Sequence, residues 1–224
     1  MTRLFITGIA GFVGSRLAQR GLDRGWEVSG VDIIPRDSAW RLKDMNVNYK
    51  WQSIQDLNVI VADFIVHAAA VTDLPFALNS PSYTILHNAL GTQVVMEAAL
   101  RGSTAQKVIV QSSESVYGYA TKIPIPEDTP LNPTNIYGAS KAAAEMIARA
   151  YYHSDQLPVI IIRSSSLFGP GMRRSQVTPI FLTQALKGQH ITIHGEGDQT
   201  RDFNYMDNLI DGIFSALERG KSGA

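Results

Sequence analysis

The sequence contains no cysteine. Without thiols the chain can form neither disulfides nor thiolate metal sites, and the redox compartment cannot be inferred from cysteine usage. No group of histidines and carboxylates has the spacing of metal ligands either, so we expect no bound metal. His67 and His87 each stand alone, and we expect structural roles for both.

Long hydrophobic runs and an excess of one charge are also missing. No apolar run approaches the roughly 18 residues that a membrane-spanning helix needs. Lys and Arg number 20 and Asp and Glu number 20, a net charge of zero, which gives no electrostatic attraction to nucleic acid or to anionic membranes. The first apolar run begins at Leu4, which leaves no room for a basic leader. We therefore expect a cytoplasmic protein that binds neither nucleic acid nor membrane.

Strand-length apolar runs alternate with helical patterns along almost the whole chain. This alternation predicts an α/β fold, a doubly wound parallel sheet with helices on both faces. The predicted strands are residues 4–6, 27–31, 48–51, 63–70, 107–113, 158–163 and 191–194. The predicted helices are residues 15–20, 81–100, 135–152, 177–186 and 208–217.

Three glycines follow the first strand in the segment Thr7-Gly8-Ile9-Ala10-Gly11-Phe12-Val13-Gly14. In a strand–turn–helix unit, Gly8 allows a sharp turn, Gly11 a close approach to phosphates and Gly14 tight helix packing. The N-terminus of the following helix offers N–H groups and a positive dipole end to an anion. The segment predicts a site for a dinucleotide pyrophosphate, although a tight turn without a ligand would use the same glycines.

Asp32 follows the second predicted strand, 18 residues beyond Gly14. A carboxylate at this distance can bind the ribose hydroxyls of the adenosine and would repel a 2′-phosphate. The position favours NAD over NADP, while Arg36 keeps NADP as an alternative. Small residues, Ala68 to Ala70, end another strand, where they leave room either for a cofactor or simply for a packed helix.

Tyr137 and Lys141 are four residues apart on a predicted helix, so they lie on one face. A nearby ammonium lowers the pKa of a tyrosine from its ordinary value near 10. Such a tyrosine can take the proton of a substrate hydroxyl while the carbon gives hydride to a nicotinamide. Ser113, at the end of a strand, can hydrogen-bond the same oxygen. A solvated helix face is the other interpretation of this spacing.

Several segments together resemble one family. Besides the glycine turn, they are Ser112 to Gly118, Tyr137 to Lys141, Arg163 with Phe168 to Gly171, and His194 to Phe203. In this order they resemble the extended short-chain dehydrogenase/reductases, and within them the NAD-dependent nucleotide-sugar epimerase/dehydratase family that includes UDP-glucose 4-epimerase. The resemblance covers essentially the whole chain.

The resemblance implies a set of site residues. The catalytic residues would be Ser113, Tyr137 and Lys141. NAD would contact Gly8, Gly11, Phe12, Val13, Gly14, Asp32, Ile33, Ile54, Ala68, Ala69, Ala70, Asn88, Tyr137, Lys141 and Ser164. The nucleotide sugar would contact Ser113, Ser166 and Arg201. It also implies a homodimer through helices 81–101 and 135–152.

The resemblance further implies residues 1–170 as the NAD-binding domain and residues 171–224 as a partial substrate lobe that is largely missing. We expect an isomerase that epimerises a nucleotide sugar by transient oxidation at C4 and re-reduction, or a truncated form of such an enzyme. The alternatives are a sugar or polyol dehydrogenase or reductase, and an NAD-binding fragment without catalysis. Family dehydratases carry Thr-Asp-Glu where this chain has Ser113-Glu114-Ser115, and this displaced acid argues against dehydration.

Overall fold

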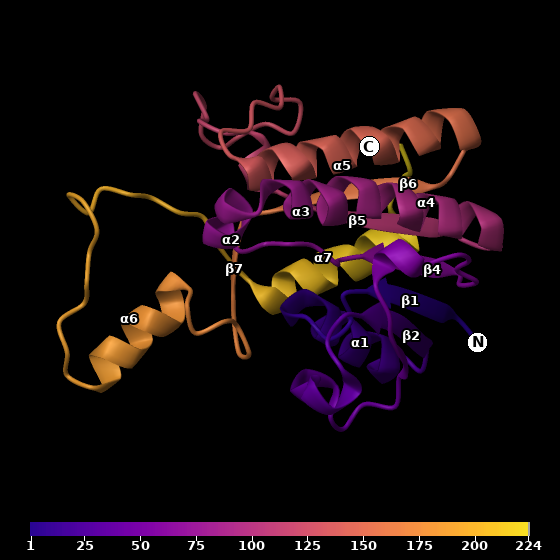
Figure 1. Cartoon of the computed structure of the whole chain (residues 1–224), viewed down its shortest axis with the longest axis horizontal. Coiled ribbons are helices and arrows are strands. Elements are labelled where there is room, and N and C mark those ends of the chain that lie inside the picture. Colours follow the sequence, from indigo (N-terminus) through magenta and orange to yellow (C-terminus); the bar gives the residue numbers. More distant parts are fainter. Residues whose placement is uncertain (224) are drawn as a thin grey trace.

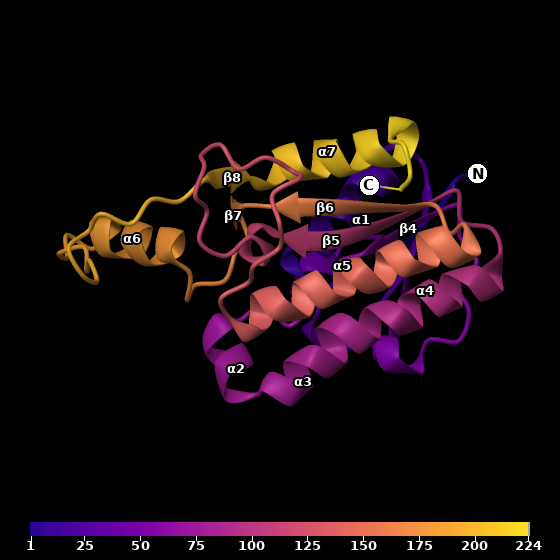
Figure 2. The same ribbon diagram turned by 90° about the horizontal axis from the view of Figure 1, so that it is seen from above.

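A computed structural model describes residues 1–223 as a parallel six-stranded sheet with helices on both faces (Figures 1 and 2). The strand order is β3-β2-β1-β4-β5-β6, and every neighbouring pair is parallel. This is the order of a doubly wound dinucleotide-binding sheet, which reverses between β1 and β4. The predicted fold class is confirmed. The strands are β1 Arg3–Thr7, β2 Glu27–Asp32, β3 Asn48–Trp51, β4 Phe64–His67, β5 Lys107–Ser113 and β6 Val159–Ser164.

Two apolar layers hold the helices to the sheet. On one face, α1 (Phe12–Asp23) and α7 (Met206–Arg219) pack on Ile6 and Ile109. On the other face, α4 (Gly91–Gly102) packs on Val108 and Val110 and lies beside α5 (Ile136–Asp155). Successive residues of β5 enter opposite layers because side chains alternate along a strand. Figure 2 shows the sheet between α7 and the pair α4 and α5. Helix α7, which belongs to the predicted second region (residues 171–224), thus packs on the sheet of the predicted first region (residues 1–170).

Shorter elements connect these layers. The predicted helix 81–100 is α3 (Pro81–Ile85), a π-helical turn (Leu86–Leu90) and α4 in succession. It is preceded by α2 (Leu74–Asn79). Short 3-10 helices span Arg36–Ser38, Trp40–Leu42, Ile54–Asp56 and Glu114–Val116. A small parallel sheet pairs β7 (Ser166–Phe168) with β8 (Phe203–Tyr205).

Residues between β7 and β8 form an arm that carries α6 (Val177–Leu186) away from the sheet (Figure 1). The predicted strand at residues 191–194 is wrong, because this stretch has no strand and is exposed. Ile191 and Ile193 alternate with polar residues as in a strand. An isolated segment nevertheless lacks a neighbouring strand to accept its backbone hydrogen bonds.

Helix α5 turns an unexpected side to the sheet. Its buried residues include Ser140, Lys141 and Glu145, whereas the apolar Ala143 and Met146 are exposed. Sequence periodicity predicts the opposite, with an apolar side against the core that consists of Ile136, Ala139, Ala143, Met146, Ile147 and Ala150. The polar side is buried because its groups find partners inside, and the apolar side is left uncovered.

Candidate active site

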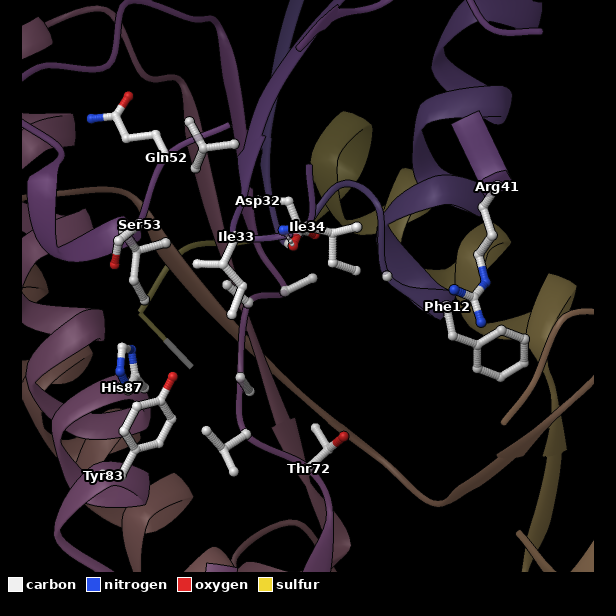
Figure 3. A pocket seen from close by; sticks show the side chains of 18 of the residues that line it. Phe12, Asp32, Ile33, Ile34, Arg41, Gln52, Ser53, Thr72, Tyr83 and His87 are labelled. Atoms are coloured by element: carbon white, nitrogen blue, oxygen red, sulfur yellow. Dashed lines mark hydrogen bonds between the residues drawn. The ribbon is translucent and has the colours of Figure 1, made fainter. Parts of the chain in front are cut away.

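The active-site region lies at the carboxyl ends of the parallel strands, as expected for this topology. A cavity of about 360 Å³ opens there. Figure 3 shows Tyr83 and His87 at one side of it, Phe12 and Arg41 at the other, and Asp32 and Ile33 between them. Its lining includes nine of the predicted cofactor residues, namely Gly8, Gly11, Phe12, Asp32, Ile33, Ile54, Ala68, Ala69 and Ala70.

The glycine turn has the geometry that the sequence predicts. Gly8 adopts φ +71°, and a Cβ there would lie 2.8 Å from the backbone of Ala69, at the end of β4. A Cβ on Gly14 would lie 2.1 Å from the Gly8 carbonyl oxygen, so α1 packs directly on the turn. Gly11 is the N-cap of α1 and has no side chain to satisfy the first-turn N–H groups. Because no side-chain cap hydrogen-bonds them, these N–H groups can receive an anion, which fits a pyrophosphate.

Asp32 joins the glycine turn to the end of β2. Its carboxylate accepts hydrogen bonds from the N–H of Ala10 at 2.9 Å and of Ile34 at 3.1 Å. Burial raises the pKa of Asp32, and these N–H donors oppose the rise. The carboxylate therefore holds the turn in place while lining the cavity, where it can also meet a ribose.

His67 has a structural environment. Its ring nitrogens pair with the hydroxyls of Thr7 at 2.7 Å and Thr92 at 3.0 Å. Burial, with the charge of Lys141, lowers the pKa of His67 to about 3, so the ring is neutral at physiological pH. His87 lines the cavity, with its ring 4.0 Å from that of Tyr83.

Several predicted cofactor residues lie outside the lining of this cavity: Val13, Gly14, Asn88, Tyr137, Lys141 and Ser164. Asn88 is buried, exchanges hydrogen bonds with both backbone groups of Val71 and donates to Ser140 Oγ at 2.9 Å. It fixes the loop after β4 against α5. Ser164 Oγ accepts a hydrogen bond from Gln111 at 2.8 Å.

Tyr137 lies in the first turn of α5, whose N-cap Asn135 accepts a hydrogen bond from the Gly138 N–H at 2.8 Å. Ser113, at the end of β5, accepts a hydrogen bond from the Ser115 N–H at 3.2 Å, and its hydroxyl lies near the Tyr137 phenol. Burial raises the pKa of Tyr137, while the Ser113 hydroxyl and the charge of Arg173 oppose the rise. The structure thus brings Ser113 and Tyr137 together, and Tyr137 lines a second cavity of about 200 Å³ with Leu74, Ala77, Leu78, Asn135 and Ile136.

Lys141 is buried one turn further along α5. Burial lowers the pKa of Lys141 to about 8, opposed by the carboxylate of Glu145. The charge of Arg173 favours the ionised phenol of Tyr137, and the predicted effect of Lys141 on the pKa of Tyr137 stays a prediction. The charge of Lys141 lowers the pKa of His67, and Glu145 favours the charged form of Lys141.

The predicted substrate side gathers at β7. Ser166 donates a hydrogen bond to Glu114 at 3.3 Å, and burial is the main cause that raises the pKa of this carboxyl. Arg201 is exposed, with one guanidinium nitrogen donating to the Thr200 carbonyl oxygen at 2.7 Å. Its charge opposes the rise in the pKa of Glu114, so Arg201 faces the same corner.

Sequence reasoning did not assign several of the residues that line the main cavity, among them Arg41, Tyr83 and Arg173. Nothing in their local sequence distinguishes them, because they belong to separate segments that meet only in the fold.

Across residues 1–223, no helix combines the length and hydropathy that crossing a membrane requires.

The chain is similar in sequence to known enzymes of two kinds. It is 31% identical to a dTDP-glucose 4,6-dehydratase of Streptomyces antibioticus, over 98% of this chain and 70% of that protein. It is 30% identical to a UDP-glucose 4-epimerase of Mycolicibacterium smegmatis, over 96% of this chain and 72% of that protein.

A solved structure agrees with the fold. The dTDP-glucose 4,6-dehydratase of Streptomyces venezuelae, determined with NAD bound, superposes with a TM-score of 0.90 and is 28% identical. The match covers 99% of this chain and 74% of that one. The sequence pattern of the NAD dependent epimerase/dehydratase family matches residues 4–224. With the glycine turn, Asp32 and the Ser113–Tyr137 pair at one edge of a doubly wound sheet, these findings show that the chain belongs to the NAD-dependent epimerase/dehydratase family.

Proposed function

We propose that the protein is a nucleotide-sugar 4-epimerase that works by transient oxidation at C4. The observation that carries the proposal is that Ser113 and Tyr137 lie together at the sheet edge that also holds the dinucleotide cavity. A hydroxyl pair beside a nicotinamide site suits proton transfer to and from a sugar hydroxyl. The epimerase relative in Mycolicibacterium smegmatis also supports it.

The chain's own residues handle the proton. Tyr137 takes the proton of the C4 hydroxyl as its carbon loses hydride, and Ser113 holds the same oxygen by a hydrogen bond. The bound nicotinamide supplies the hydride acceptor and, later, the hydride donor. Tyr137 returns its proton to the keto oxygen when hydride comes back to the other face of the sugar. Proton and hydride are both restored, so no external oxidant is consumed.

Glu114 favours a second candidate, a nucleotide-sugar dehydratase. Eliminating water next to a keto group needs a base for the carbon-bound proton and an acid for the leaving hydroxyl. Glu114 adjoins Ser113 in sequence, hydrogen-bonds Ser166 and has a raised pKa, which suits an acid near neutral pH. The dehydratase relative of Streptomyces antibioticus supports this candidate. The 4-epimerase comes first because Ser115 stands where those enzymes carry their second acid.

Product analysis separates these functions. The purified protein is incubated with NAD and either UDP-glucose or dTDP-glucose, and the products are examined by NMR and mass spectrometry. Epimerisation changes the C4 proton signal without a change of mass, whereas dehydration removes one water. Net absorbance of reduced nicotinamide indicates a dehydrogenase. No change with any nucleotide sugar, despite NAD binding, would contradict both proposals and leave a binding protein.

Matched variants assign the chemistry. Glu114→Gln keeps the shape of the side chain and removes its acid function. If the protein is an epimerase, this variant retains turnover within about tenfold; if it is a dehydratase, turnover falls by the 10²–10⁴-fold that is typical of a general acid. Ser115→Ala serves as the neighbouring control.

We also propose that the protein forms a homodimer through its exposed apolar helix face. This face consists of Ile85, Leu86 and Leu90 with Ala143 and Met146 of α5. The π-helical turn and α3 lie against α5, so the residues belong to adjoining elements. A second copy would cover this continuous apolar surface and remove it from water.

A further inference from the structure

Arg41 has an unusual environment at the cofactor cavity. It belongs to the 3-10 helix Trp40–Leu42, and its guanidinium lies 4.4 Å from the Trp40 ring centroid. One terminal nitrogen donates to the Gly171 carbonyl oxygen at 2.6 Å. Its Nε is buried, and no acceptor for it lies within residues 1–223. A buried donor without an acceptor is costly, so a partner from outside the chain would stabilise this arrangement.

Arg173 reaches the same cavity from a distant segment. It follows Gly171 by two residues, and its guanidinium donates to the Thr72 hydroxyl at 3.1 Å and pairs with Asp73 at 3.4 Å. Arg41 and Arg173 both line the cavity together with Gly11 and Phe12. The pKa of Arg41 is lowered, first by burial and then by the charge of Arg173. Two like charges beside one cavity repel each other unless an anion lies between them.

The two nearby carboxylates, Asp32 and Asp73, do not cancel the positive charge of Arg41 and Arg173. Asp32 favours the charged form of Arg41, but its oxygens already accept hydrogen bonds from Ala10 and Ile34. Asp73 meets Arg173 at the exposed surface, where each side chain is 42% exposed. Water weakens such a pair, and the lining of the cavity holds two guanidiniums against the one carboxylate of Asp32.

We infer that Arg41 and Arg173 bind the diphosphate of the dinucleotide from the side opposite the first turn of α1. Phe12 and Val13 begin α1, so their N–H groups can donate to the phosphates from the glycine turn, and Arg41 extends toward the Phe12 side of the cavity (Figure 3). A guanidinium can hold phosphate oxygens with paired, charge-assisted hydrogen bonds. The contact of Arg41 with Gly171 joins the loop after β2 to the segment after β7. Both segments therefore close over the cofactor.

This inference requires dinucleotide binding, which the proposed function also requires, but it does not depend on the sugar or on the reaction. The test measures affinity by calorimetry for ADP-ribose, which carries the diphosphate, and for adenosine, which does not. The variants are Arg41→Met and Arg173→Met. Their controls are Arg36→Met and Arg174→Met, from the same segments but outside the cavity lining.

Each test variant is expected to bind ADP-ribose about tenfold to a hundredfold more weakly, the range for one charged hydrogen bond. Adenosine affinity should stay within about twofold, and both controls should resemble the wild type. Arg41→Lys keeps the charge without the guanidinium geometry and should lie between wild type and Arg41→Met. It also serves as the second variant if Arg41→Met fails to fold, as judged by circular dichroism.

Three results would overturn the inference: unchanged ADP-ribose affinity in both methionine variants, an equal loss for adenosine, or no ADP-ribose binding by the wild type. If the variants lose affinity only for 2′-AMP, measured in the same way, Arg41 would be assigned to the 2′-phosphate of NADP. That result would also overturn the inference. Failure of the wild type to turn over any nucleotide sugar, with the ADP-ribose pattern intact, would contradict the proposed function alone.

Discussion

At the active-site edge, buried charged side chains are paired with one another. Arg163 donates two hydrogen bonds to the carboxylate of Glu145, at 2.9 and 2.7 Å, and Ser112 adds a third at 2.5 Å. Glu145 also favours the charged form of Lys141. Fully buried carboxylates are tolerated when each oxygen has donors. This network keeps the ammonium of Lys141 buried, one turn along α5 from Tyr137.

Removal of the Tyr137 hydroxyl tests the proposed proton transfer. Tyr137→Phe retains the ring but loses the group that exchanges a proton with the substrate, so turnover should fall by about 10²–10⁴-fold. NAD affinity should remain near the wild-type value, because Tyr137 lies outside the main cavity lining. Steady-state kinetics with the identified nucleotide sugar and calorimetry with NAD provide the two measurements. Near-normal turnover would assign the base to another residue.

His67 should make the protein sensitive to acid. Its pKa is about 3 in the folded protein, compared with about 6.5 in an unfolded chain. Between these values the unfolded state binds the extra proton, so the free energy of unfolding falls as the pH falls, by up to about 1.4 kcal/mol per pH unit. Above about pH 6.5 this residue contributes no further change.

Urea unfolding between pH 7 and pH 4 checks this prediction. His67→Gln keeps polar atoms for Thr7 and Thr92 and does not titrate, so its unfolding free energy should depend less steeply on pH. The exposed His190 offers a matched control, His190→Gln, which should keep the wild-type slope. Equal slopes in all three proteins would rule out His67 as the source.

At the scale of elements, the start of α5 positions the reacting groups. Asn135 caps the helix two residues before Tyr137. Three residues before the cap, the N–H of Asn132 donates to the carbonyl oxygen of Val116 and holds the loop against the 3-10 helix that follows β5. Loss of the cap would free the first turn of the helix. Tyr137 would then lose its fixed relation to Ser113.

Asn135→Ala should lower the free energy of unfolding by about 1 kcal/mol, the typical effect of losing an N-cap side chain. Asn135→Ser retains a capping oxygen and should recover most of that loss. Denaturant unfolding measures the stability, and turnover of the same two variants shows whether the first turn also orders Tyr137. A stability loss in the serine variant as large as in the alanine variant would contradict the capping role.

At the scale of the whole molecule, the inner and outer faces of α5 differ in what covers them. The inner face of α5 buries polar groups against the sheet, and the outer face exposes Ala143 and Met146. Self-association would give that outer face an apolar partner. Arg149 is an exposed charged residue of the same helix and serves as the control for the dimer proposal.

Sedimentation of the wild type should therefore show a dimer, whereas Met146→Glu combined with Leu90→Glu should sediment as a monomer. Two carboxylates placed in an apolar interface would lose hydration without gaining partners. Arg149→Glu exchanges one exposed charge for another on the same helix and should leave the dimer intact. A wild-type monomer at micromolar concentration would remove the dimer proposal.

Local sequence was informative where the backbone itself carries the signal. Glycine spacing predicts the turn at Gly8, and the apolar run 107–113 matches β5 residue for residue. Periodicity failed at α5 because it detects an apolar face but not what covers it. It failed at residues 191–194 because a strand requires a neighbour that is distant in sequence.

The sequence by itself determined the doubly wound sheet, the dinucleotide turn and the family, since these depend on short segments with fixed internal spacing. Only the tertiary structure decided that Arg41 and Arg173 line one cavity and that Glu114 meets Ser166. Each of these depends on where separate segments meet at the strand ends. Burial and electrostatics act through space, and spacing along the chain does not record that distance.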